Sequence, residues 1–356
     1  MNSKKKIVAA ISGGVDSSVA AAIYKEKGYE VIGVTLKMKS CDENTEKRKS
    51  CCGIDDDLHA RTTADSIGIA HYFLDVREDF TAKVLKKGWE EYASGRTPNP
   101  CALCNRYLKF GRLLDYARKI GAEGIITGHY SIVRQNAGPT YSLHRGIDSQ
   151  KDQSYFLFAL TQEQLASTHM PLGTMTKKEV REYARRIGLP NAEKTESQDA
   201  CFGIGDEAFS ETLRRLFNGL PQKGFIIGDD GKALGEHNGI HLYTIGQRKG
   251  LGIALGKPAY VWKIDKGNVY LSADEGRLFS ENMLVENVNW QCPAKTESFE
   301  CEVQIRYRSK PVKAKLTPCG ASSYMVDFEK QQRAVTPGQA AVFYDGDKLL
   351  GGGWIS

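Results

Sequence analysis

The strongest constraint on the fold of this chain is a loop rich in glycine and serine near the N-terminus, between a short apolar run and an amphipathic one. Residues 7–11 are apolar and mostly β-branched, as is typical of a buried parallel strand. The loop 12–18 (Ser-Gly-Gly-Val-Asp-Ser-Ser) follows, and the pattern predicts a helix over 16–27 and then a second strand that ends at residue 36. Such a unit directs backbone N–H groups and the positive end of a helix dipole at an anion, so the sequence predicts a phosphate-binding loop.

The loop differs from two common phosphate-binding motifs. It lacks the Gly-Lys-Ser/Thr of a Walker A motif, and it lacks the Gly-x-Gly-x-x-Gly of a dinucleotide-binding turn. Two glycines, an acid and three hydroxyls nevertheless converge on one helix start. The alternative interpretation is an ordinary strand–turn–helix unit whose serines only cap the helix.

Apolar segments alternate with predicted helices up to about residue 205, which favours an α/β fold with a doubly wound parallel sheet. After Gly224, short strand-like runs are interrupted by Gly, Pro, Asn and Asp, which predicts a small β-rich linker domain and then a C-terminal β-barrel. The predicted domains are 1–205, 206–275 and 276–356. Strands are predicted over 7–11, 31–36, 70–74 and 124–127, and helices over 16–27, 55–67, 79–94, 108–120, 176–187 and 207–217.

Composition limits the possible functions. With 356 residues the chain is long enough for two or three domains, and its net charge of +6 permits a nucleic-acid partner without requiring one. No apolar run is long enough to span a bilayer, and the basic start of the chain has no signal-peptide pattern, so we expect a cytoplasmic protein with no membrane partner. In that setting the nine cysteines indicate reactive or metal-binding thiols rather than a disulfide framework.

Three cysteines stand in segments that read as loops. Residues 95–105 contain two prolines and two asparagines, so we expect no regular structure there and a helix from Arg106. Cys104 would then lie beside a helix N-terminus, a position that lowers a thiol pKa. Cys101 precedes it in a Cys-x-x-Cys pattern, and Cys201 lies among small residues farther along the chain. The alternative is that these thiols only pack as small apolar side chains.

Taken in order, these motifs resemble the bacterial tRNA-specific 2-thiouridylase family of the PP-loop (ATP-pyrophosphatase) superfamily, over essentially the whole chain. The matching segments are 12–18, Gly95-Arg96-Thr97-Pro98-Asn99-Pro100, Cys104-Asn105, Thr127-Gly128-His129-Tyr130, Lys151-Asp152-Gln153-Ser154-Tyr155-Phe156, Cys201-Phe202, 246–252 and Thr336-Pro337-Gly338-Gln339. Each motif alone is modest evidence, and their order along one chain makes the resemblance strong.

The resemblance implies an ATP-dependent enzyme that converts the wobble uridine (position 34) of tRNA to 2-thiouridine. In such enzymes the C2 oxygen is adenylated and sulfur arrives on a cysteine persulfide. Cys201 would carry the persulfide, and Cys104 would be the catalytic thiol that releases the sulfur by forming a disulfide bond with Cys201. The implied ATP-binding residues are Ala10, Ile11, Ser12, Gly13, Gly14, Val15, Asp16, Ser17, Leu36 and Gly128. The implied tRNA-binding residues are Asn99, Pro100, Cys101, Lys151, Asp152, Gln153, Arg306 and Tyr307.

Cys101 departs from the family pattern, because most relatives carry Asp at this position. A neutral thiol cannot act as the carboxylate would, so the general base is left unassigned. The substitution also creates a set of three thiols, Cys101, Cys104 and Cys201, which suits a [4Fe-4S] cluster with one open iron position. The alternatives are a resolving thiol that protects Cys104 and a tolerated replacement.

The resemblance also implies partners. They are Mg²⁺ with the ATP, the tRNAs for Glu, Gln and Lys, and a cysteine desulfurase or a sulfur-relay protein, and we expect a monomer. The basic run 305–315 and the basic turn 246–250 are candidate RNA contacts, although both also suit a solvated surface. Two other functions stay open: a PP-loop ligase or amidotransferase acting on a small molecule, and a redox- or metal-sensing RNA-binding protein.

Overall fold

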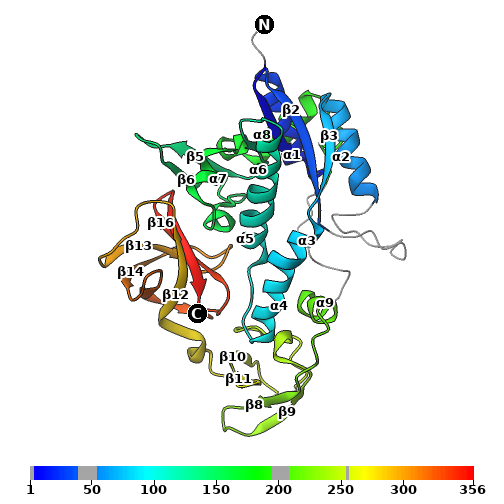
Figure 1. Ribbon diagram of the computed structural model, residues 1–356. Coiled ribbons are helices and arrows are strands. Elements are labelled where there is room, and N and C mark those ends of the chain that lie inside the picture. The colour runs from blue at the N-terminus through cyan, green and yellow to red at the C-terminus, as the bar shows by residue number, and fades with distance from the viewer. Residues whose placement is uncertain (1–3, 39–53, 195–207, 254–255) are drawn as a thin grey trace. The chain divides into compact units, whose positions relative to one another are not determined.

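The computed structural model describes residues 4–38, 54–194, 208–253 and 256–356 (Figure 1). The chain divides into two compact units. The first consists of the described residues of 1–83, 101–205 and 346–350, and the second consists of those of 84–100, 206–345 and 351–356.

The first unit is an α/β domain. Its strands are β1 (Lys6–Ala10), β2 (Glu30–Lys37), β3 (Ala70–Asp75), β4 (Ile125–Ile126), β5 (Ser131–Gln135), β6 (Tyr141–Arg145) and β7 (Thr168–His169). Its helices are α1 (Val15–Glu26), α2 (Ile54–Ile67), α3 (Arg77–Phe80), α5 (Pro100–Cys104, whose first residue belongs to the second unit), α6 (Leu113–Lys119), α7 (Gln162–Ala166) and α8 (Lys177–Arg186).

The centre of this unit is a parallel sheet, which in the described part of the chain has five strands in the order β3-β2-β1-β4-β7. Helices α1, α2 and α8 bury their apolar residues against one face, around Ile7, Val19 and Val180, while α6 packs against β1 and β4. The predicted doubly wound sheet is confirmed. The strand order reverses between β1 and β4, and ligands of such sheets bind at the carboxyl ends of the strands at this switch point.

Most predicted elements of this unit are present, including the capping box of α8, in which Thr176 and Glu179 bond to each other's backbone N–H groups. The two-residue strand β7 and the hairpin β5–β6 were not predicted. A strand of two residues has no pattern, whereas Asn136, Gly138 and Pro139 between two strand-like runs were a hairpin signal. One prediction was wrong. Pro100–Cys104 is helical and continues into π-helical turns over Asn105–Arg112. Proline is compatible with a first helical position because its missing N–H would have no partner there.

The second unit is rich in strands. They are β8 (Gly224–Ile227), β9 (Ala233–His237), β10 (Tyr260–Asp265), β11 (Asn268–Ser272), β12 (Phe279–Trp290), β13 (Phe299–Gln304), β14 (Val312–Pro318), β15 (Tyr324–Arg333), β16 (Ala340–Asp345) and β17 (Lys348–Ile355, whose first three residues belong to the first unit). Helices α4 (Lys86–Ala93) and α9 (Phe209–Leu216) pack together in the same unit. The predicted helix 79–94 is therefore divided into α3, a π-helical turn Thr81–Leu85, and α4.

The strands of the second unit form two groups. Strands β8–β11 pair in the order β10-β11-β8-β9. Strands β12 to β17 pair in the order β12-β15-β14-β13-β16-β17, and residues 351–355 of β17 return to pair with β12, which closes a barrel. The predicted linker domain and C-terminal β-barrel are confirmed. The predicted domain boundaries stay a prediction.

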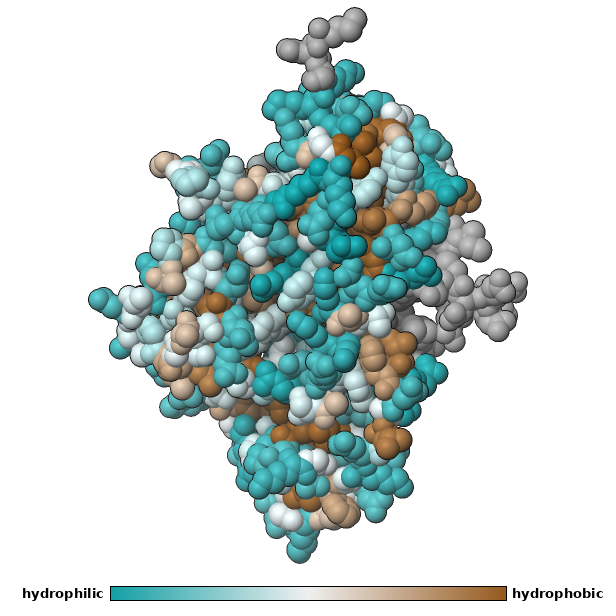
Figure 2. Space-filling view, viewed as in Figure 1, coloured by the Kyte–Doolittle hydropathy of each residue, from teal (hydrophilic) through white to brown (hydrophobic). Residues whose placement is uncertain are grey.

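The surface is mostly hydrophilic on the face shown in Figure 2, and its hydrophobic residues form small separate areas. Among the described residues, no helix has the length and apolarity that crossing a membrane requires.

Candidate active site

The predicted phosphate-binding loop joins β1 to α1. Gly13 adopts a positive φ of 74°, which suits a residue without a Cβ. The N-cap of α1 is Gly14, and it provides no side-chain cap. Ser17 and Ser18 instead donate to the Gly14 carbonyl, at 3.0 and 2.9 Å. Within the described part of the chain, no side chain caps this helix, so the capping role that the alternative gave to the serines is wrong. That the first turn of α1 binds an anion stays a prediction.

The remaining predicted ATP-binding residues lie at the same edge of the sheet. Leu36 is the penultimate residue of β2, whose Val34 carbonyl accepts from the Ile11 N–H at 2.9 Å. Gly128 follows β4 and lies directly against the first turn of α1, since a Cβ there would be only 2.7 Å from the Asp16 carbonyl carbon. The structure thus gathers the ten predicted residues at the switch point of the sheet.

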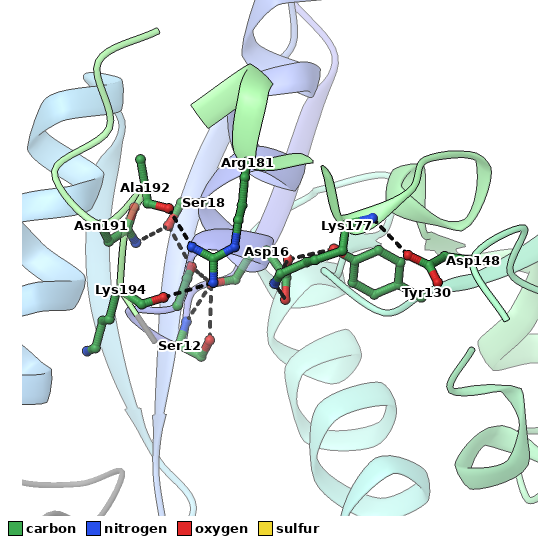
Figure 3. A network of polar contacts seen from close by, with 12 residues as sticks. Ser12, Asp16, Ser18, Tyr130, Asp148, Lys177, Arg181, Asn191, Ala192 and Lys194 are labelled. Atoms are coloured by element: carbon green, nitrogen blue, oxygen red, sulfur yellow. Dashed lines mark hydrogen bonds and ion pairs between the residues drawn. The ribbon is translucent and has the colours of Figure 1, made fainter. Parts of the chain in front are cut away.

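Asp16, in the first turn of α1, is the centre of a polar network (Figure 3). Its carboxylate accepts from the Tyr130 hydroxyl at 2.8 Å. The Lys177 ammonium donates to both carboxylate oxygens, at 2.7 and 2.8 Å. The sequence reasoning missed Lys177, and its only sequence signal was its place just after the N-cap Thr176 of α8.

A second set of hydrogen bonds holds the phosphate loop through Gly13 and Ser18. The Asn191 amide donates to the Gly13 carbonyl at 3.2 Å and to the Ser18 hydroxyl at 2.9 Å. Arg181 of α8 donates to the carbonyls of Ala192 and Lys194, at 2.9 and 3.2 Å (Figure 3). Residues 191–194 are therefore tied both to the phosphate loop and to α8. Cys201 lies outside the described residues.

The two cysteines of the Cys-x-x-Cys pattern lie on α5. Cys104 is the last of the five residues of this helix, so it does not lie at a helix N-terminus as predicted. Its side chain is buried, and its Sγ lies 3.9 Å from the Sδ of Met38, two residues beyond Leu36. Cys104 therefore lies beside the carboxyl end of β2, at the same sheet edge as the phosphate loop. Cys101 is partly exposed, three residues earlier on the helix.

His129 follows Gly128, and its side chain contacts neighbouring side chains of the fold. Its Nδ1 lies 3.0 Å from the Thr127 hydroxyl, and its ring packs on Phe110 with the centroids 5.3 Å apart. Burial, with a smaller contribution from the charge of Lys109, lowers the pKa of His129 from 6.5 to about 3. The imidazole is therefore neutral at physiological pH. Tyr130 and Tyr155, which lie in the matching motifs, are buried, and Phe202 lies outside the described residues.

The predicted tRNA-binding segment 151–153 follows β6. Lys151 is partly exposed, and Gln153 exchanges hydrogen bonds with the backbone of Tyr130. Asp152 is buried: its carboxylate accepts from Arg145, from the Ser154 hydroxyl, and from the Gly146 and Ser154 N–H groups, at 2.8 to 3.1 Å. Within the first unit, the hydrogen bonds to Asp152 thus fix the loop that carries Lys151 and Gln153.

We expect Asp152→Ala to lower the free energy of unfolding by about 3 kcal/mol, because it removes the buried carboxylate that accepts from Arg145 and from two backbone N–H groups. The matched control is Glu182→Ala, which removes an exposed ion pair with Lys178 of 3.9 Å and is expected to cost under about 0.5 kcal/mol. Urea unfolding measures both. Equal stabilities of the two variants would contradict the structural role of Asp152.

Other predicted tRNA contacts belong to the second unit. The guanidinium of Arg306 donates to the carbonyls of Arg333 and Ala334, and the Gln304 amide donates to the carbonyls of Arg306 and Tyr307. Residues 305–310 form a turn, and β14 begins at Val312, so only the second half of the basic run 305–315 is a strand. The basic segment 246–250 is also held in place, since the N–H of Gly246 donates to the Val261 carbonyl at 2.7 Å.

The motif Thr336-Pro337-Gly338-Gln339 hydrogen-bonds to residues 97 and 98, which lead into α5. The Gln339 amide donates to the carbonyls of Thr97 and Pro98, at 3.1 and 2.9 Å. The Thr97 N–H donates to the Pro337 carbonyl at 2.8 Å. The predicted contact residue Asn99 follows this supported segment directly and is buried. The sequence contained the motif but no signal of what it contacts.

No group of three or more His, Cys, Asp or Glu side chains in the described part of the chain is arranged to bind a metal. The Asp16 carboxylate is the acidic group at the phosphate loop. This suits Mg²⁺, which keeps several waters and takes its other ligands from phosphates rather than from an all-protein cage.

The sequence matches known families along most of its length. Residues 5–205 match the family described as tRNA methyl transferase HUP domain, residues 215–272 match its PRC-barrel domain, and residues 280–355 match the aminomethyltransferase beta-barrel domain.

Three relatives are each named tRNA-specific 2-thiouridylase MnmA. The chain is 44% identical over 359 residues to the protein of Geotalea uraniireducens, covering 99% of this chain and 96% of the relative. It is 42% identical over 360 residues to that of Magnetococcus marinus, covering all of both chains. It is 44% identical over 360 residues to that of Carboxydothermus hydrogenoformans, covering 99% and 98%. The chain therefore belongs to the tRNA-specific 2-thiouridylase family.

Proposed function

We propose that this chain is a tRNA-uridine 2-sulfurtransferase that uses ATP to replace the C2 oxygen of the wobble uridine by sulfur. The observation that carries the proposal is the position of the buried Cys104 at the same sheet edge as the loop 12–18. An activating site for ATP and a thiol at one strand edge suit a reaction in which an oxygen is first activated and then displaced by sulfur. Membership of the family supports the same reaction.

The phosphate loop would bind the ATP. The backbone of residues 12–17 and the dipole of α1 would stabilise the phosphates, and Gly128, which has no Cβ, lets the first turn of α1 lie directly against it. Adenylation of the C2 oxygen turns a poor leaving group into a good one and releases pyrophosphate. Mg²⁺ bound near Asp16 would supply charge neutralisation of the phosphates.

The sulfur step would use two cysteines. The terminal sulfur of a persulfide on Cys201 attacks C2, and AMP leaves with the former C2 oxygen. Cys104 then attacks the Cys201 sulfur, which forms a disulfide bond and releases the thiolated base. Two thiols would have to be restored by an external reductant before the next turnover. The sulfur would come from a cysteine desulfurase or a relay protein.

The tRNA would contact both units. Lys151 and Gln153 would bind it from the first unit and Arg306 and Tyr307 from the second, while Asn99, Pro100 and Cys101 would line the target base. Asp152 would contribute indirectly by holding its loop. To react, the uridine must leave its stack, as in other enzymes that modify bases.

The test is nucleoside mass spectrometry of unmodified tRNA after anaerobic incubation with the protein, Mg-ATP, a thiol reductant, and a cysteine desulfurase with cysteine, which supplies sulfur at the persulfide level. We expect an ATP-dependent replacement of oxygen by sulfur at the wobble uridine, and pyrophosphate release only when tRNA is present. Pyrophosphate release without tRNA would favour a small-molecule ligase instead. Tight tRNA binding without any pyrophosphate would favour an RNA-binding sensor.

The Cys-x-x-Cys pattern motivates a second version of the same reaction. In it, Cys101, Cys104 and Cys201 would hold an iron–sulfur cluster, which would supply an open iron position for sulfide. Iron and sulfide in stoichiometric amounts in anaerobically purified protein, with loss of activity on iron chelation, would favour this version. Fully active, iron-free protein would exclude it.

A further inference from the structure

The ion pair between Lys177 and Asp16 joins two helices at the mouth of the phosphate loop (Figure 3). The lysine side chain is 12% exposed and the aspartate 29% exposed, so the pair is partly shielded from solvent but open on the aspartate side. The two residues are 161 positions apart in the sequence. The lysine ammonium therefore lies within hydrogen-bond distance of the first turn of α1, where phosphates would bind.

The backbone of Lys177 is firmly held. Its N–H donates to the Asp148 carboxylate at 2.9 Å, and the capping box of Thr176 and Glu179 closes the first turn of α8. Only the flexible four-carbon side chain needs to move for the ammonium to change partners. A lysine whose backbone is fixed and whose ammonium can reorient is suited to exchange one anionic partner for another.

The negative charge of bound ATP would give the Lys177 ammonium a second anionic partner beside Asp16. Mg-ATP keeps a net negative charge even when the Mg²⁺ proposed near Asp16 is counted, so a cation beside the loop still favours its binding. The Tyr130 hydroxyl hydrogen-bonds to Asp16 independently of the lysine, at 2.8 Å, so the aspartate keeps one donor if the lysine leaves. The ammonium has three donors and binds phosphate well as a point charge.

We propose that Lys177 is a nucleotide-binding residue whose ammonium rests on Asp16 when the loop is empty and moves to the polyphosphate when ATP binds. This inference rests on the proposed use of ATP. The competing explanation is that Lys177 only clamps α8 to α1, or only neutralises Asp16.

The test compares two neighbouring lysines. Lys177→Met is expected to weaken binding of Mg-ATP roughly 10- to 100-fold by calorimetry, the range for a lost hydrogen bond to a charged group. Binding of adenosine, which has no phosphates, should stay within about twofold. The matched control Lys178→Met removes the same charge from an 85% exposed side chain one residue away, and Mg-ATP binding should not change. Thermal unfolding of each variant shows whether it is folded.

An Asp16→Asn background separates the explanations. If Lys177 contacts the phosphates, Asp16→Asn with Lys177→Met binds Mg-ATP at least tenfold more weakly than Asp16→Asn alone. If the lysine only neutralises or clamps Asp16, those two variants bind equally, and this inference is wrong while the proposed ATP site stands. Failure of the unmodified protein to bind Mg-ATP would overturn the proposed use of ATP, and this inference with it.

Discussion

Replacing Cys104 by serine is expected to lower the rate of tRNA thiolation roughly 10³-fold or more, the scale seen when a catalytic nucleophile is removed. The change replaces one sulfur by oxygen in a side chain that is 3% exposed, so the fold should be retained. A serine hydroxyl is not ionised at neutral pH and does not attack a sulfur atom, so release of the thiolated base should stop. Nucleoside mass spectrometry at several time points measures the rate.

The control for this prediction is Cys319→Ser, which makes the same chemical change at an exposed cysteine of the second unit. Its rate should equal that of the unmodified protein. Pyrophosphate release in the presence of tRNA should survive in Cys104→Ser for the first turnover, because adenylation precedes sulfur release. A Cys104→Ser protein that thiolates at the normal rate would rule out the proposed role of this residue.

Gly128→Ala is expected to weaken Mg-ATP binding by at least roughly tenfold and to destabilise the fold by about 1–3 kcal/mol. A Cβ at this position would lie 2.7 Å from the carbonyl carbon of Asp16 and 2.8 Å from the Ser17 nitrogen. Both atoms are backbone, so no side-chain rotation relieves the contact. The first turn of α1 would have to move, and with it the N–H groups that are proposed to bind phosphate.

The matched control is Gly138→Ala, because a Cβ there has no atom within 4 Å and the residue has no positive φ. It should leave both nucleotide affinity and stability unchanged. Calorimetry with Mg-ATP and urea unfolding test the pair of variants. If Gly128→Ala binds nucleotide as tightly as Gly138→Ala, the close approach of Gly128 to α1 does not shape the nucleotide site.

Local pattern was sufficient for much of the fold. The strands β1 to β3 and the helices α1 and α8 were predicted within one or two residues, because period, caps and glycines act within one or two helical turns. The helix α5 was the main error. Two prolines and two asparagines suggested a loop, but Pro100 occupies the one helical position that tolerates it, and the cysteines follow inside the helix.

The candidate site, like the fold, could be predicted only in part from the sequence. Residues 12–18 were recognisable from sequence because a phosphate-binding loop is a continuous segment whose glycines and hydroxyls are adjacent. Lys177, Tyr130 and Gln339 were not assigned roles, because each acts on a residue 114 to 242 positions away. The resemblance implies that Asp152 contacts tRNA, and only its four accepted hydrogen bonds show what its carboxylate does in the fold.

The sequence by itself determined the α/β domain with its phosphate loop, the β-rich remainder and the family of this chain. These depend on periodicity, turn chemistry and ordered motifs, all of which are properties of short sequence segments. Only the tertiary structure decided which side chains meet: that Lys177 lies on Asp16, that Gly128 packs on α1, and that Cys104 lies beside the end of β2. The physical reason is that burial and packing select these partners among all residues of the chain, and no local pattern encodes that selection.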